Sequence, residues 1–311
     1  MTLQRDVFID YINQAADNDK DIFFLSADFG AKALDNFRAK HPDQFLHCGI
    51  SEQHMIDMAA GLSLAGKKVY VYAMGPFFLR CYEQIKCLAM MNLPVTMIST
   101  GVGLGYADSG PTHYLTEDIA CFRALNGIEI LTPADPLCTL AAAKQSLADP
   151  VLRYIRLDRE PLPSFDRGKY HYLEEGVNKL ARDGFHEFVT GSGVCILSSG
   201  YMLHRCLEAC KQLEVRPTVI SLFRIKPISD SLGDVIMRHD AVLTVEEQCL
   251  SGGFGSAVLE VMSDNNIHIP VKRMGLPDRY YFENGGRAML LDKFGLSVDD
   301  ICSAVKEFQN I

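Results

Sequence analysis

The sequence lacks any run of Lys and Arg residues, and its 311 residues carry a formal net charge of −9 at pH 7. Proteins that bind nucleic-acid phosphates need clustered basic residues, so we expect no nucleic-acid partner. The most apolar window, residues 58–74, is broken by Lys67 and Lys68 and is too short to span a bilayer. No apolar signal-peptide core stands near residue 1, so we expect a cytoplasmic protein with no membrane partner.

The sequence also has no Cys-x-x-Cys pair, although it contains ten cysteines. Their irregular spacing argues against a metal or redox site, and we interpret them as small, reduced core residues. Cys206 and Cys210 stand one helical turn apart, and we assign this pair to the core as well.

Short β-rich apolar segments alternate with segments of helical periodicity in the first half of the chain. We predict buried strands at residues 22–26, 69–72, 95–98, 128–131 and 151–155, and helices at residues 51–65, 77–92, 116–125 and 136–147. Asp135 and Pro136 suit the N-cap and first turn of the last of these helices. Strands that alternate with helices indicate the α/β class, with a mostly parallel sheet covered on both faces.

The alternation weakens after Arg159 and resumes at Val194, and the intervening stretch is rich in Gly, Pro and charged residues. Beyond it we predict further strands at residues 194–198, 217–222, 241–245 and 268–273, and helices at residues 201–213, 253–262 and 297–308. The pattern predicts two doubly wound domains, the second one smaller. We place them at residues 1–163 and 191–311, with a linker at residues 164–190.

Four polar segments follow predicted strands of the first domain and carry Asp28, Glu52, His54 and His113. Ligands in open α/β sheets bind beyond the carboxyl ends of the strands, and this set of side chains is suited to proton transfer. Each residue also has a structural interpretation. Glu52 could stabilise a helix start, Asp28 could cap a loop, and His113 could lie exposed in a turn. The spacing alone leaves these alternatives open.

Two of these segments resemble motifs of the transketolase superfamily. The first is Gly-Ile-Ser-Glu-Gln-His at residues 49–54, followed by Ala-Ala-Gly-Leu at residues 59–62, which is similar to the glutamate motif of that superfamily. The second is Asp-Ser-Gly-Pro-Thr-His at residues 108–113, followed by Thr-Pro-Ala-Asp at residues 132–135. The resemblance is strongest to 1-deoxy-xylulose-5-phosphate synthases and transketolases, and pyruvate dehydrogenase beta subunits are more distant. It covers nearly the whole chain, as a pyrimidine-binding domain followed by a transketolase C-terminal domain.

The resemblance implies thiamine diphosphate as the cofactor. Glu52 matches the glutamate that bonds a nitrogen of the cofactor's pyrimidine ring, where proton exchange promotes loss of the proton from the reactive carbon. Phe77 matches the aromatic residue that stacks on this ring. Asp28 and Ser51 correspond to positions beside the cofactor.

The same resemblance assigns several residues to the substrate. His113 matches a histidine that contacts a substrate hydroxyl or carbonyl, and His54 and Asp108 lie in the same motifs. Arg156 matches the arginine that binds the sugar phosphate, a contact that suits the planar guanidinium. Arg80 matches a residue at the mouth of the substrate site.

The chain departs from the family pattern beside His113. The family usually has an acid four residues before this histidine, where the chain has Ser109, and Asp108 stands one residue further away. The loop at residues 100–105 also lacks the His or Arg of familiar members. Both changes fall where acceptor sugars bind, so the identity of the acceptor stays open.

The chain has no Gly-Asp-Gly motif, which in this superfamily holds the cofactor's diphosphate through Mg²⁺. The domain that carries this motif normally precedes the segment corresponding to residue 1. The resemblance therefore implies an N-terminal transketolase subunit as partner, which would ligate Mg²⁺, in a dimer of heterodimers.

We expect the C-terminal subunit of a split transketolase, a transferase that moves a two-carbon ketol unit between sugar phosphates only together with its partner. One alternative is a subunit of a pyruvate-using synthase or a beta-type 2-oxoacid dehydrogenase subunit. Another is a non-catalytic regulatory subunit. The presence of Glu52, Phe77, His113 and Arg156 argues against this last alternative, because a degenerate copy would have lost Glu52 first.

Overall fold

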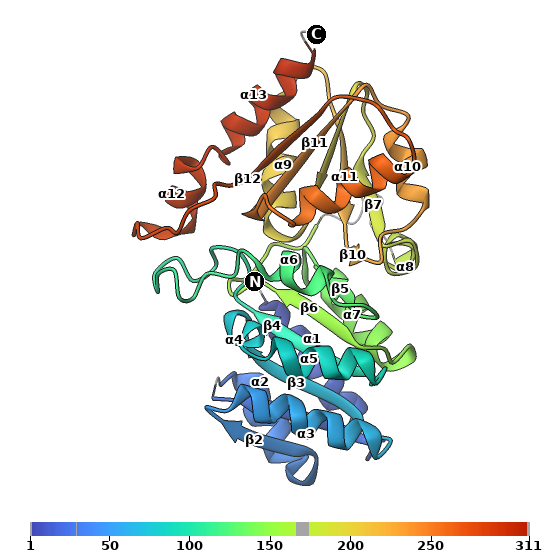
Figure 1. The fold of residues 1–311 in the computed structure, drawn as a ribbon, viewed down its shortest axis with the longest axis vertical. Coiled ribbons are helices and arrows are strands. Elements are labelled where there is room, and N and C mark those ends of the chain that lie inside the picture. The colour runs from blue at the N-terminus through green and yellow to red at the C-terminus, as the bar shows by residue number, and fades with distance from the viewer. Residues whose placement is uncertain (1, 29, 166–173, 310–311) are drawn as a thin grey trace.

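The computed structural model describes residues 2–28, 30–165 and 174–309 and arranges them around two sheets (Figure 1). The first sheet has seven strands in the order β10-β5-β6-β4-β3-β1-β2, and the second has five in the order β12-β11-β8-β9-β7. Both sheets are mostly parallel, which confirms the predicted α/β class. No helix among the described residues is long and apolar enough to cross a membrane.

The first sheet is built almost wholly from the first half of the chain. Its parallel strands are β1 (Ile22–Ala27), β2 (Phe45–Gly49), β3 (Lys68–Met74), β4 (Val95–Thr100), β5 (Glu129–Leu131) and β6 (Arg153–Leu157). The seventh strand, β10 (Arg224–Lys226), pairs antiparallel with β5 and comes from the second half of the chain. The helices are α1 (Gln4–Ala15), α2 (Lys32–Lys40), α3 (Glu52–Leu64), α4 (Gly75–Leu79), α5 (Tyr82–Met90), α6 (Asp118–Arg123) and α7 (Pro136–Ala148), with a 3-10 turn η1 (Pro42–Gln44).

Alternate side chains of the central strands point to opposite faces of this sheet, as the pleat requires. On β3, Tyr70 and Tyr72 belong to the apolar cluster that includes α1, α2 and α7. Val69 and Val71 belong instead to the cluster that includes α3 and α5. Both faces of the sheet are therefore buried under apolar side chains, and polar groups collect where the strands end.

The second sheet repeats this arrangement on a smaller scale. Its strands are β7 (Phe185–Val189), β8 (Val194–Ser198), β9 (Thr218–Leu222), β11 (Ala241–Cys249) and β12 (Val271–Leu276), with β7 antiparallel to β9. Its helices are α8 (Glu174–Asp183), α9 (Gly200–Gln212), α10 (Ser231–Ile236), α11 (Phe254–Asp264), α12 (Gly286–Lys293) and α13 (Val298–Gln309). Buried residues of α9 and α13 share one apolar cluster, and those of α10 and α11 share the other.

The segment at residues 164–190 differs from the predicted linker. It contains helix α8 and strand β7, and β7 forms an edge of the second sheet. Phe185 and Phe188 of β7 are buried, but polar residues stand between and around them. The strand therefore has no continuous apolar pattern from which the sequence could predict it. Residues 166–173 of the predicted linker lie outside the described residues, and the two domain boundaries stay predictions.

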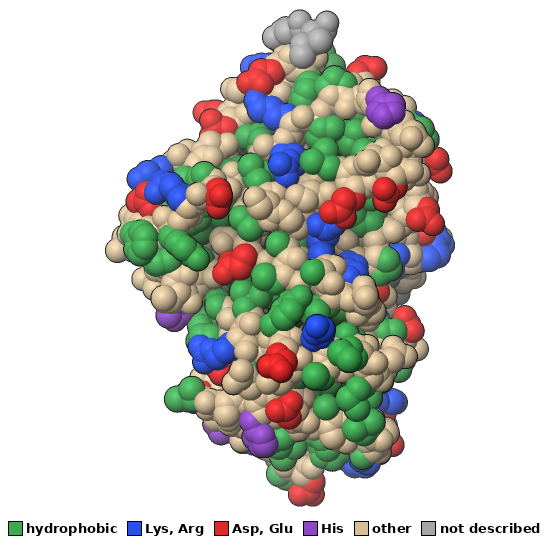
Figure 2. Space-filling view, in the orientation of Figure 1, with side chains coloured by type: hydrophobic (Ala, Val, Ile, Leu, Met, Phe, Trp, Pro, Cys, Tyr) green, Lys and Arg blue, Asp and Glu red, His purple; other side chains and the backbone are tan. Residues whose placement is uncertain are grey.

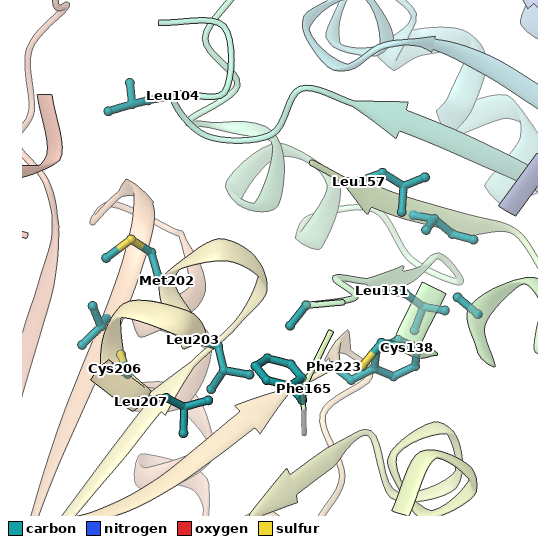
Figure 3. Close-up of a cluster of buried hydrophobic side chains, with 14 of the residues drawn as sticks. Leu104, Leu131, Cys138, Leu157, Phe165, Met202, Leu203, Cys206, Leu207 and Phe223 are labelled. Carbon is teal, nitrogen blue, oxygen red and sulfur yellow. The ribbon is translucent and has the colours of Figure 1, made fainter. Parts of the chain in front are cut away.

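One apolar cluster joins the two halves of the molecule. Figure 3 shows Phe165 and Phe223 between Leu203 of α9 and the pair Leu131 and Cys138 of the first domain. The same cluster also contains Leu104 and Leu157 of the first domain and Met202, Cys206 and Leu207 of α9. On the face drawn in Figure 2, Lys and Arg side chains are interspersed with Asp and Glu side chains over both domains. A shared apolar core therefore joins the two domains, together with ion pairs such as Arg287 with Asp158 and Arg123 with Glu260.

The second domain contains a buried acid whose titration we expect to affect stability. Glu246 of β11 accepts hydrogen bonds from the backbone N–H groups of Phe254 and Gly255, at 2.7 and 2.8 Å. Burial raises the pKa of Glu246 to about 7, from an ordinary value of 4.5. Between these values the folded protein keeps a proton that the unfolded chain releases. The free energy of unfolding should therefore fall as the pH rises from about 4.5 to 7, by up to about 3 kcal/mol.

Urea unfolding of the wild type and of Glu246→Gln at pH 5 and pH 7.5 tests this expectation. The wild type should lose more stability between the two pH values than the variant, because the amide does not titrate. Glu214→Gln, at an exposed position, serves as the control and should keep the wild-type pH dependence. An equal pH dependence in the wild type and Glu246→Gln would contradict the assignment.

Candidate active site

Five neighbouring strands of the first sheet, in the order β6, β4, β3, β1 and β2, run parallel and end at one edge. The segments that follow them carry Arg159, His113, Phe77, Asp28 and Glu52, in that order. We call this edge the rim. Open parallel sheets bind ligands at such an edge, so the fold brings most of the predicted site residues to a place where a ligand can bind.

Glu52, Phe77 and Arg80 form one group on the rim. Glu52 is the first residue of α3, and only 4% of its surface is exposed. Its Oε2 lies 3.3 Å from Nη1 of Arg80, and the Arg80 guanidinium lies 4.9 Å from the centre of the half-buried Phe77 ring. A carboxyl group buried with a single contact to a partly exposed arginine is costly for a fold, which marks it as a candidate functional group.

The other predicted residues of this part of the rim are more exposed. Asp28 follows β1, and His54 lies in the first turn of α3; both side chains are exposed. Ser51 precedes α3, and its hydroxyl donates to the carbonyl oxygen of Cys48 at 2.5 Å rather than capping the helix. The adjacent Ile50 is 79% exposed.

A second group surrounds His113. The Tyr106 ring lies 6.2 Å from the His113 ring, and Nδ1 of His113 lies 3.0 Å from the Thr112 hydroxyl. The Arg159 guanidinium lies over the Tyr106 ring at 4.4 Å and donates from Nη1 to Oδ1 of Asp108 at 2.5 Å. This hydrogen bond with Arg159 lowers the pKa of Asp108, so the carboxylate is ionised at neutral pH. The group thus places a guanidinium and an imidazole beside the Tyr106 ring, with a carboxylate bonded to the guanidinium.

Arg156 lies in a different environment from the one that its predicted role requires. It is only 2% exposed and donates from Nε and Nη2 to the two oxygens of the fully buried Asp118, at 2.6 and 3.1 Å. The hydroxyl of Tyr154 donates to the same carboxylate at 3.0 Å. Burial works to lower the pKa of Arg156, but Asp118 outweighs it and raises the pKa. This position gives no support to the predicted contact between Arg156 and a sugar phosphate.

The sequence analysis missed Arg159, Tyr106 and Arg5. The strand predicted at residues 151–155 runs in fact from Arg153 to Leu157, so Arg156 stands inside the strand and Arg159 just beyond it. Tyr106 lacks a distinctive motif, and Arg5 belongs to an unpredicted helix, α1. Burial raises the pKa of Tyr106, while the charges of Arg159 and Arg5 act in the opposite direction. Arg159 stands two residues beyond the end of β6, so a correct strand end was the signal that could have found it.

Across residues 2–28, 30–165 and 174–309, no three His, Cys, Asp or Glu side chains are placed to hold a metal ion together.

Two family models match the chain. Residues 3–164 match the model described as transketolase, pyrimidine binding domain, and residues 187–301 match the one described as transketolase, C-terminal domain. The chain is 33% identical to a 1-deoxy-D-xylulose-5-phosphate synthase of Nitratidesulfovibrio vulgaris, over 97% of the chain but 47% of the synthase. It thus spans about half the length of that relative.

Two further relatives have the same extent as this chain. One of the subunits of an apulose-4-phosphate transketolase from Phocaeicola vulgatus is 29% identical, over 98% of the chain and 96% of that relative. A solved structure described as a split gene transketolase, inactive beta4 tetramer, is 29% identical, with a TM-score of 0.84 over 99% of the chain and 98% of that protein. A transketolase of Pichia stipitis is 18% identical with a TM-score of 0.79 over 99% of the chain and 46% of that protein, which shows the shared fold.

The two arginines of β6 and its following loop should differ in their effects on stability. Arg156→Leu leaves the buried Asp118 carboxylate without its cation, so we expect the free energy of unfolding to fall by about 3–5 kcal/mol. Arg159→Leu removes a partly exposed pair with Asp108 and should cost less than about 1 kcal/mol. Urea unfolding of both variants measures the difference. If Arg159→Leu were the more destabilising change, the placement of the two side chains would be wrong.

Proposed function

The chain belongs to the transketolase family, and from this premise we propose that it is the C-terminal subunit of a split, thiamine-diphosphate-dependent transketolase. The reaction is the transfer of a two-carbon ketol unit between sugar phosphates. The observation that carries the proposal is the buried carboxyl of Glu52 at the rim, whose partner Arg80 lies over the Phe77 ring. Members of this family depend on thiamine diphosphate, which agrees with such a pair of side chains.

The residues of the first group fit the pyrimidine ring of the cofactor. Phe77 is half-buried, so one part of its ring is available for stacking. Glu52 shares the Arg80 guanidinium with Phe77 and would hold a proton and exchange it with a nitrogen of the pyrimidine ring. When bound, the cofactor supplies a carbon nucleophile that accepts the two-carbon unit. Asp28 and Ser51 would line the same site, and the partner chain would bind Mg²⁺ and the diphosphate.

The residues of the second group would bind the substrate. His113 would form a hydrogen bond with a substrate oxygen. Its neighbour Thr112 lies within hydrogen-bond distance of the same imidazole ring. We assign the phosphate contact to Arg159 instead of Arg156, because the Arg159 side chain is 36% exposed at the rim. Asp108 would orient this guanidinium or contact sugar hydroxyls. Arg80 and His54 would lie at the mouth of the site.

We further propose that the chain works only with an N-terminal subunit, in a dimer of heterodimers. The Phocaeicola vulgatus relative has the length of this chain and is described as a subunit, which supports this division. The solved split-gene relative is described as an inactive tetramer of beta subunits, which agrees with a need for a partner. The exposed Ile50 beside Glu52 would be covered by that partner.

A second candidate is a pyruvate-using synthase. It is favoured by the 33% identity with a 1-deoxy-D-xylulose-5-phosphate synthase. The two candidates differ in one product, because the synthase releases CO₂ from pyruvate and ketol transfer does not. Assays of the reconstituted enzyme with pyruvate and with ketose phosphates therefore distinguish them.

Cofactor binding should require both subunits. We expect calorimetric titration of thiamine diphosphate with Mg²⁺ into the isolated chain to give no measurable heat of binding, because this chain offers only the pyrimidine side. The same titration with a co-expressed subunit carrying a Gly-Asp-Gly motif should give saturable binding that a chelator removes. Tight binding to the isolated chain would show that the diphosphate site lies here and would refute the need for a partner.

Glu52→Gln should abolish most of the turnover of the reconstituted enzyme. The amide has nearly the same shape but cannot exchange the proton, so we expect kcat to fall at least about 100-fold. Glu83→Gln, at an exposed position of α5, is the control and should leave kcat unchanged. Assembly with the partner is checked by size-exclusion chromatography. Unchanged turnover in a correctly assembled Glu52→Gln enzyme would support the regulatory alternative instead.

A further inference from the structure

One arginine of the second domain forms hydrogen bonds with two carboxylates. Each of these carboxylates also accepts a backbone hydrogen bond from a segment that carries rim residues. Arg287, the second residue of α12, is only 7% exposed. Its Nε and Nη2 donate to the two oxygens of Glu247 in β11, at 2.7 and 2.5 Å. Its Nη1 lies 2.9 and 2.8 Å from the two oxygens of Asp158, in the first domain. The guanidinium also lies 3.9 Å from the centre of the Tyr201 ring, which limits its freedom further.

Through Asp158, Arg287 is connected to Arg159. Asp158 immediately precedes Arg159, and its Oδ1 accepts the backbone N–H of Glu160 at 2.9 Å. The backbone N–H of Asp158 donates to the side-chain oxygen of the buried Gln4 at 2.8 Å. The residues on both sides of Arg159 are therefore held by the bonded Asp158 carboxylate and by Gln4.

Through Glu247, Arg287 is connected to Tyr106 and the His113 loop. Oε1 of Glu247 accepts the backbone N–H of Leu104 at 3.0 Å, two residues before Tyr106. A Cβ on Gly103, whose φ is +59°, would lie 2.6 Å from this carboxyl group, so the loop rests directly on Glu247. Gly103 also pairs with Leu115, two residues after His113. Both halves of the Arg159–Tyr106 stack are thus tied to one guanidinium.

We propose that Arg287 is a positioning residue for the substrate rim, which fixes Arg159 over Tyr106 in the geometry that binds a phosphate group. The inference rests on the proposed function, in which Arg159 contacts the substrate phosphate. The planar fork is essential because it bonds two carboxylates in fixed directions, whereas the ammonium of a lysine supplies charge without that geometry. Arg287 reaches the rim only through these carboxylates and does not itself touch the substrate.

The test compares Arg287→Lys with a matched control, Arg123→Lys. Arg123 also bridges the two domains, since Nη1 donates to the carbonyl oxygen of Gly252 at 2.8 Å and Nη2 pairs with Glu260. The probe is inorganic phosphate, titrated into the full chain and followed by the NMR signal of the ¹³C-labelled His113 ring. His113→Gln assigns that signal, and Arg159→Ala should remove the saturable shift. Thermal unfolding confirms that each variant is folded.

We expect phosphate to bind roughly tenfold more weakly to Arg287→Lys than to the wild type, because small displacements at a binding site have large effects. Arg123→Lys should stay within about twofold of the wild type, since its contacts lie outside the rim. In the reconstituted enzyme, KM for a phosphorylated acceptor should rise in Arg287→Lys while KM for an unphosphorylated acceptor stays constant. A lysine variant that binds phosphate as the wild type does would overturn the inference.

A second variant keeps the test decisive if Arg287→Lys does not fold. Glu247→Gln removes one of the two carboxylates while Arg287 and Asp158 still balance in charge, and it should weaken phosphate binding in the same direction. Normal binding in this variant would also overturn the inference. If phosphate caused no saturable shift of the His113 signal in the wild type, the chain would have no anion site at the rim and the inference would be wrong. Ketol transfer by the reconstituted wild type, measured separately, decides the proposed function.

Discussion

Parallel hydrogen bonding between five neighbouring strands is the constraint on which the candidate site depends. Because β6, β4, β3, β1 and β2 run in one direction, the segments after them all emerge at one edge. Both faces of this sheet are covered by helices, so polar side chains can collect only at its ends. Residues far apart in the sequence, such as Asp28 and Arg159, therefore lie at the same edge of the sheet. The rim is a consequence of strand direction, and its chemistry depends on which residue stands just beyond each strand.

Buried carboxylates in this protein differ in how well they are paired. Asp118 receives two guanidinium hydrogen bonds from Arg156, and Glu247 receives two from Arg287. Glu52 has one contact at 3.3 Å, with Arg80, whose side chain is 54% exposed. Well-paired buried ions are structural, because removing one partner leaves an uncompensated charge. The weaker pairing of Glu52 agrees with its proposed role, because an acid that exchanges a proton with a ligand must be able to leave its partner.

The elements that the sequence predicts are those whose burial is local and continuous. The strands β1, β3, β4, β8 and β9 are apolar runs, and the structure has them within about two residues of the prediction. Strand β2 was missed because His47 and Gly49 interrupt its short apolar part, and β10 because its three residues are defined only by pairing with β5. An apolar pattern reports burial, but it does not report which distant strand supplies the partner.

The same limit applies to the site. A shift of two residues in the end of β6 exchanges the surroundings of Arg156 and Arg159, and sequence patterns rarely fix an element boundary more closely. The motifs at residues 49–54 and 108–113 lie at the rim, and the binding roles of their residues stay predictions. The ion pairs beneath it join residues far apart in the sequence, such as Asp118 with Arg156 and Asp158 with Arg287, so no local pattern could have predicted them.

The loop that carries His113 is held at both ends by strand β11 of the second domain. Before the histidine, the backbone N–H of Leu104 donates to the side chain of Glu247. After it, the carbonyl oxygen of Thr116 accepts the backbone N–H of Cys249 at 2.9 Å. A loop between two fixed points has fewer conformations to lose when it orders around a ligand, which lowers the entropic cost of binding. The second domain therefore contributes to the rim by restraining the loop that carries His113.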